Sequence, residues 1–162
     1  MGISVESVFV IKTQCIPDWS EIGKIRDQVA LSLGGLRQSL RDAAVMVVSE
    51  LVENAIKYGE SIPNAPGIEV SVVRERTRLS VTVASGTKDD EAARRLQNYT
   101  EALAASQDKL GMYVARVQSL ADTPEPHSRL GLYRIGLEGA FDLKCTHEDG
   151  VLRMTATRAL EW

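Results

Sequence analysis

The sequence predicts an α+β protein, a two-layer α/β sandwich in which helices lie on one face of a mixed sheet. The hydrophobic pattern indicates a strand, two helices, two strands, a helical stretch and a final pair of strands, an order that does not alternate strictly. Of the 162 residues, 44% are hydrophobic and 25% are charged, which is ordinary for a globular protein. Because no repeat or linker divides the chain, we expect residues 1–162 to form one domain.

The first strand and the first helix are predicted before Gly35. Residues 6–16 alternate between apolar and polar side chains, as a half-buried strand does. Asp18 and Glu21 have the spacing of a capping box, which predicts that a helix begins at Asp18. This helix should end at Gly34 and Gly35, and its apolar face consists of Ile22, Ile25, Val29 and Leu33.

A second helix, at residues 36–58, has two distinct faces. At about 100° per residue, Asn54 and Lys57 lie within about 40° of Glu50. The opposite face is apolar and comprises Ala44, Val48, Leu51, Val52 and Ala55. The polar stripe of Glu50, Asn54 and Lys57 is either the solvated face of an amphipathic helix or part of a binding site.

The remaining elements follow from turn residues and periodicity. Pro, Asn and Gly predict a loop, Val-rich runs predict strands, and apolar residues three, four or seven apart predict helices. In order, we expect a loop at 61–67, strands at 67–75 and 78–84, helical structure at 89–121 divided or bent at Gly111, a helix at 130–139, and a hairpin of 141–147 and 151–160 turned by 148–150.

Composition argues against several functional classes. The net charge of −3 gives no reason to expect nucleic-acid binding, and no apolar run is long enough to cross a membrane or act as a signal. His127 and His147 have no companions at metal-ligand spacing. Cys15 and Cys145 also lack such spacing, so we expect two buried thiols of a cytoplasmic protein, with a disulfide as the alternative.

The string from Glu50 to Gly59, Glu-Leu-Val-x-Asn-Ala-x-Lys-Tyr-Gly, resembles the N box of the GHKL ATPases. This superfamily, with the histidine kinase-like ATPase fold, includes DNA gyrase, Hsp90, the histidine kinases and the anti-sigma-factor serine kinases. The resemblance implies that ATP and Mg²⁺ bind, with Asn54 as the magnesium ligand and Glu50 as the general base. It also implies that Lys57 and Tyr58 lie near the phosphates or the ribose.

The adenine-reading motif of that superfamily, Asp-x-Gly-x-Gly, is incomplete in this chain. Ser85 and Gly86 stand in its place as candidate nucleotide contacts, without the preceding aspartate. Asp89 and Asp90 either replace this aspartate or form the acidic first turn of the next helix. Thr157 lies where the family often has a threonine beside the adenine, although threonine is also common in strands.

The phosphate-binding motif, Gly-x-Gly-Leu-Gly-Leu, is also only partly present. Leu130, Gly131 and Leu132 match its second half, whereas His127 and Arg129 stand at its first two glycines. Arg129 could bind phosphate through its guanidinium, and the alternative is a surface loop before a helix.

The helical stretch 89–121 occupies the position of the family's nucleotide lid and most resembles the SiaB-type kinases of bacterial signalling. Its apolar stripe either packs internally or forms a face for a partner or a homodimer. Two functions are therefore expected. One is an ATP-dependent Ser/Thr protein kinase acting on a small anti-sigma-antagonist-like protein, with Lys57 and Arg129 neutralising phosphate charge. The other is a nucleotide-free protein-binding module of the same fold.

Overall fold

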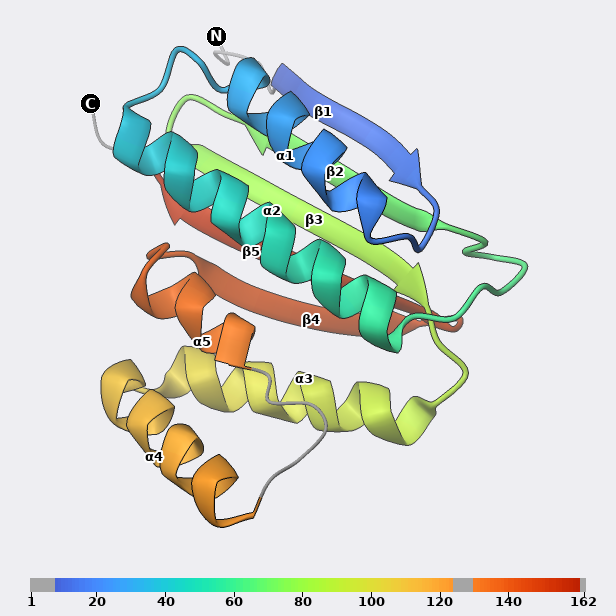
Figure 1. The fold of residues 1–162 in the computed structure, drawn as a ribbon, viewed down its shortest axis with the longest axis vertical. Coiled ribbons are helices and arrows are strands. Elements are labelled where there is room, and N and C mark those ends of the chain that lie inside the picture. The colour runs from blue at the N-terminus through green and yellow to red at the C-terminus, as the bar shows by residue number, and fades with distance from the viewer. Residues whose placement is uncertain (1–7, 124–129, 161–162) are drawn as a thin grey trace, which may run out of the picture.

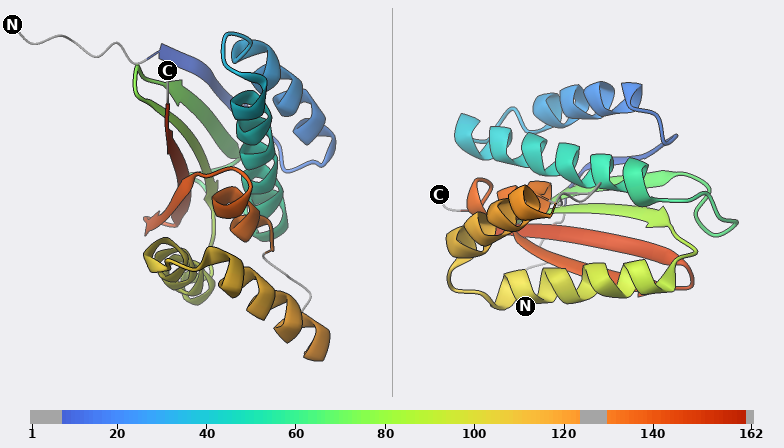
Figure 2. Two further views of the ribbon diagram at one scale, coloured as in Figure 1. Left: turned by 90° about the vertical axis from the view of Figure 1, so that its left-hand side faces the viewer. Right: turned by 60° about the horizontal axis from the view of Figure 1, so that its bottom comes forward.

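The computed structural model describes residues 8–123 and 130–160. It contains a five-stranded sheet in the order β1-β2-β3-β5-β4, with α1, α2 and α5 over one face and α3 along the β4 edge (Figure 1, Figure 2). The predicted two-layer α+β sandwich is therefore confirmed. The elements are β1 Val8–Cys15, α1 Ser20–Ser32, α2 Gln38–Tyr58, β2 Ile68–Arg74, β3 Arg78–Gly86, α3 Asp90–Ala105, α4 Lys109–Asp122, α5 Leu130–Leu137, β4 Asp142–Glu148 and β5 Val151–Ala159.

Within the described residues, every pair of neighbouring strands is antiparallel, so the expected mixed sheet is wrong in this respect. The connections explain the difference. Two helices separate β1 from β2, and the chain reverses direction before each of them and again before β2, which leaves β2 antiparallel to β1 (Figure 1). Short hairpins join β2 to β3 and β4 to β5, and hairpins require antiparallel strands.

The core lies between α2 and the sheet. The face of α2 that the sequence predicted to be apolar is buried, including Val48 and Val52, which have no exposed surface. They meet the inward side chains of the central strands, such as Val70, Val72 and Val81. Removing apolar surface from water stabilises the folded state by about 25 cal/mol per Å², so this apolar contact is the main interaction that holds α2 on the sheet.

Two helix starts differ from the prediction because of their caps. α1 begins at Ser20, and the Asp18 carboxylate accepts from the Ser20 N–H at 2.9 Å, so the predicted capping box does not form. The 89–121 stretch divides before Gly111. Asp108 is the N-cap of α4, and its carboxylate accepts from the Gly111 N–H at 2.9 Å, which places Gly111 in the first turn of the new helix.

The apolar stripe of residues 89–121 has two different environments. In α3, Leu103 is buried and Leu96 packs against the core, as expected for internal packing. In α4, no residue is buried, and the stripe of Leu110, Val114 and Val117 is exposed by 62%, 46% and 41%. Internal packing therefore holds for α3 alone.

The expectation of two buried thiols is confirmed. Cys15 and Cys145 are buried and unpaired, and burial raises both thiol pKa values, that of Cys145 to about 12. No helix in the described part of the chain combines the length and the apolar character that a membrane span requires.

Candidate functional site

A cavity of about 300 Å³ opens between the C-terminal half of α2, the strands β3 and β5, and the helices α3 and α5. Its walls are mainly apolar and include Leu51, Leu96, Leu132 and Met154. A cavity of this size is at the lower end of the range for small-molecule sites, and an apolar lining with a few polar groups is their usual composition. The cavity is therefore the candidate ligand site of this protein.

On α2, Asn54 places a polar side chain with an unsatisfied hydrogen-bond donor at this cavity. It lines the cavity, and its Nδ2 is buried with no hydrogen-bond partner among the described residues. Leaving a buried donor unpaired costs about 1–3 kcal/mol, so a ligand acceptor at this point would recover that energy. A half-turn of the carboxamide would instead present Oδ1, an oxygen of the type that a magnesium ion binds.

The end of β3 and the start of α3 form another part of the cavity wall. Ser85 and Thr87 are buried there, and the Thr87 hydroxyl accepts from the Asp89 N–H at 3.2 Å. One oxygen of the Asp89 carboxylate caps α3 by accepting from the Ala92 N–H at 2.9 Å. Asp89 and Asp90 thus have the role of an acidic helix start, while Asp89 also borders the cavity.

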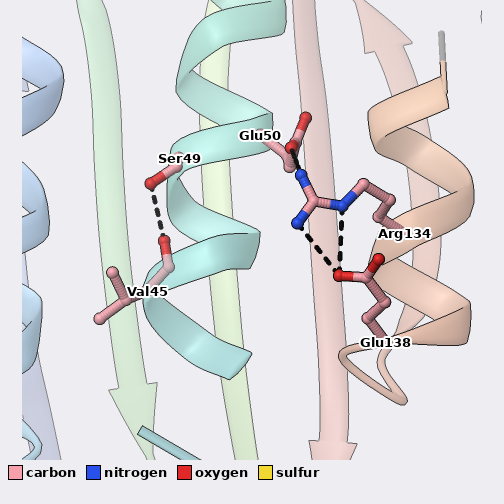
Figure 3. A network of polar contacts seen from close by, with 5 residues as sticks. All are labelled: Val45, Ser49, Glu50, Arg134 and Glu138. Atoms are coloured by element: carbon pink, nitrogen blue, oxygen red, sulfur yellow. Dashed lines mark hydrogen bonds and ion pairs between the residues drawn. The ribbon is translucent and has the colours of Figure 1, made fainter. Parts of the chain in front are cut away.

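Glu50, the predicted general base, is not among the residues that line the cavity, and its carboxylate points towards Arg134 of α5 (Figure 3). Its Oε1 is 2.9 Å from Nη1 of Arg134, and its side chain is only 16% exposed. Burial raises the pKa of Glu50, the neighbouring Glu53 adds to the rise, and Arg134 opposes it. In this arrangement Glu50 forms part of an ion pair between α2 and α5.

Gly131 lies against the other oxygen of the same carboxylate. A Cβ atom at position 131 would overlap Oε2 of Glu50 and would lie 2.8 Å from its Cδ. Leu130 is the first residue of α5, and among the three matched motif residues only Leu132 borders the cavity. Arg129 lies outside the described residues.

Three further predicted contacts lie away from the cavity. Lys57 is exposed, and its Nζ is 6.0 Å from the ring centroid of Trp19, because the start of α1 packs beside this end of α2. Gly86 packs against the loop after α2, where its carbonyl accepts from the Glu60 N–H at 2.7 Å. Thr157 is on the opposite face of β5 from Met154 and the cavity, since alternate residues of a strand face opposite sides.

Tyr58 and Ser85, by contrast, line the cavity as predicted. The sequence reasoning did not identify Thr87, Glu60, Arg95 or Arg134. Arg95 follows the helical period of α3, but nothing local indicates that this face of α3 borders the cavity. Arg134 and Glu138 are four residues apart and form an ion pair of 3.0 Å, so this pair alone had a sequence signal.

Asn54 is the predicted magnesium ligand in this cavity, and the carboxylates of Glu60 and Asp89 also line it. Within the described residues, no three acidic, histidine or cysteine side chains are grouped so that they could hold a metal ion. A magnesium ion that arrives on a nucleotide needs few protein ligands, because phosphate and water oxygens complete its octahedron. The single carboxamide therefore fits a nucleotide-borne magnesium ion.

The sequence was compared with protein-family models and with curated proteins. No family model matches it, and no curated protein matches it significantly. The function of the cavity is therefore inferred from its own residues and their geometry.

Proposed function

We propose that this chain is a bacterial, cytoplasmic signal-transduction regulator of the histidine kinase-like ATPase type, and that its cavity binds ATP with Mg²⁺. The observation that carries the proposal is the Nδ2 of Asn54 in the cavity wall, which is buried and has no hydrogen-bond partner in the part of the chain that the structure describes. Asn54 belongs to the string that resembles the N box, and Tyr58, one turn further along α2, lines the same cavity. Sequence motif and cavity thus support the same ligand.

The walls of the cavity suit a nucleoside with its phosphates directed along α2. The apolar side chains of Leu96 and Met154 offer surfaces for a planar base, and Ser85 offers a hydroxyl for its polar edge. Asn54 would hold magnesium, which when bound neutralises phosphate charge and orients the phosphates. The corresponding activity is transfer of a phosphoryl group to a Ser or Thr hydroxyl of a small anti-sigma-antagonist-like protein, with Glu50 as the proton acceptor.

Calorimetric titration of Mg-ATP into the protein tests this proposal. Asn54→Ala should weaken binding at least tenfold, and it should not lower stability because the Asn54 Nδ2 is buried without a hydrogen-bond partner among the described residues. Asn64→Ala is the matched control, since Asn64 is exposed and donates to the Asp149 carbonyl, away from the cavity. Absence of heat at millimolar Mg-ATP, or equal binding by the Asn54 and Asn64 variants, would reject the proposal.

A nucleotide-free protein-binding module of the same fold is the second candidate. The charges around the cavity favour it. Among its described lining residues, the carboxylates of Glu60 and Asp89 outnumber the single cation, Arg95, whereas a triphosphate requires positive charge. Cells that carry Asn54→Ala would then retain the regulatory phenotype, and purified protein would show no nucleotide binding.

A further inference from the structure

Arg134 joins α2 to α5 through one inter-helix ion pair (Figure 3). Its guanidinium also binds Glu138, the residue directly after α5, with Nε at 3.2 Å and Nη2 at 3.0 Å from Oε2. Glu138 is 58% exposed, and its pair with Arg134 is a local contact at the C-terminal end of α5. In this triad, the Glu50–Arg134 contact is therefore the one that connects the two helices.

The Glu50 carboxylate is enclosed from both sides by α5. Arg134 donates to Oε1, and the backbone at Gly131 occupies the space beside Oε2 so closely that a Cβ atom would not fit. A base must have a carboxylate oxygen within hydrogen-bond reach of the proton it accepts. In this structure Oε1 is bound to Arg134, Oε2 lies beside Gly131, and Glu50 does not line the cavity.

The same helix also closes part of the cavity. Leu132 lies between Gly131 and Arg134 in the chain, is 1% exposed, and forms part of the cavity wall. A displacement of α5 would therefore widen the cavity and uncover Glu50 in one movement. Packed elements of this kind change between discrete arrangements, which is how a local contact can control a site.

We propose that α5 is an autoinhibitory latch, in which Arg134 and Gly131 withhold Glu50 from the cavity until α5 moves. The role of Glu50 after release rests on the proposed function, whereas the latch itself is a property of the nucleotide-free protein. Arg134 remains 42% exposed, so an anionic group can approach the guanidinium and compete with Glu50 for it.

Hydrogen exchange of the nucleotide-free protein, followed by mass spectrometry, tests the latch directly. Arg134→Gln should accelerate amide exchange in residues 130–137 at least fivefold. Glu138→Gln, which also removes one charge of the triad but leaves the inter-helix pair, should change exchange by less than twofold. Equal exchange of α5 in the wild type and in Arg134→Gln would overturn the latch.

A second measurement varies the salt concentration and uses the wild-type protein, so it does not depend on whether a variant folds. Raising the salt concentration to 1 M screens a partly exposed ion pair, so it should accelerate α5 exchange in the wild type. An exchange rate of α5 that is independent of salt would contradict the latch even if Arg134→Gln does not fold.

Where Mg-ATP binding has been shown by calorimetry, Arg134→Gln should hydrolyse ATP several-fold faster than the wild type. Unchanged hydrolysis would overturn the withholding of Glu50, while absent nucleotide binding would reject only the proposed function.

Discussion

The substitution Gly131→Ala should have opposite effects on stability depending on whether Glu50 is present. In the wild type, the new methyl group would overlap Oε2 of Glu50, so the carboxylate must move away and its 2.9 Å contact with Arg134 must break. If Glu50 is first replaced by alanine, the space is empty. The same methyl group then only improves the helix propensity of α5.

The magnitudes follow from these contacts. The Glu50–Arg134 pair is partly exposed at Arg134, so its loss should cost about 1 kcal/mol. Displacing a tightly packed side chain should add about 1 kcal/mol. Alanine in place of glycine in a helix gains about 0.5–1 kcal/mol. We therefore expect Gly131→Ala to lower the free energy of unfolding by about 1 kcal/mol in the wild type and to raise it by about 0.5 kcal/mol in Glu50→Ala.

Urea denaturation followed by circular dichroism measures all four members of this double-mutant cycle. Gly23→Ala provides the matched control. Gly23 is an exposed position within α1 where a Cβ atom would meet nothing within 4 Å, so the substitution should stabilise the protein in both backgrounds. If Gly131→Ala has the same sign with and without Glu50, the close contact between α2 and α5 described above is wrong.

Two further predictions concern pH and the core. Burial raises the pKa of Glu50 above its ordinary value of 4.5, so the protonated side chain contributes stability at low pH that is lost as the pH rises through the folded-state pKa. The free energy of unfolding of the wild type, relative to Glu50→Gln, should therefore fall as the pH rises above 4.5, and a rise would refute the burial argument. Val48→Ala should cost about 2 kcal/mol because Val48 is fully buried, whereas Val114→Ala on the exposed face of α4 should change stability by less than about 0.5 kcal/mol. Comparable losses from the two variants in urea titrations would mean that α4 packs against another surface.

Periodicity in the sequence was sufficient to predict most helices and strands. The α2 helix and the β4–β5 hairpin could be predicted because burial on one face leaves a repeat of 3.6 or 2 residues. In the hairpin turn, Asp149 and Gly150 both have positive φ, 53° and 76°, which is the conformation that an Asp-Gly turn favours. Boundaries were less predictable, since Asp108 and Gly111 could each mark a break and only the cap hydrogen bond distinguishes them.

The sequence predicted part of the candidate site, namely Asn54 and Tyr58 on α2, Ser85 on β3 and Leu132 on α5. Asn54 and Tyr58 are part of a short local string, and both line the cavity. The partners of this helix come from distant parts of the chain: Arg134 is 84 residues from Glu50. No local pattern encodes such a contact, because it depends on how α5 packs against α2 in the folded protein.

By itself, the sequence determined the α+β class, the order of the elements and the polar stripe of Glu50, Asn54 and Lys57, because these depend on local periodicity and short motifs. Only the tertiary structure decided what each member of the stripe meets. Asn54 borders the cavity, Glu50 binds Arg134, and the Lys57 ammonium lies near the Trp19 ring. The physical reason is that α1 and α5 pack against α2, whereas α3 packs along β4 and lies across the cavity from α2 (Figure 1). One continuous stripe in the sequence thus has three separate environments in the folded protein.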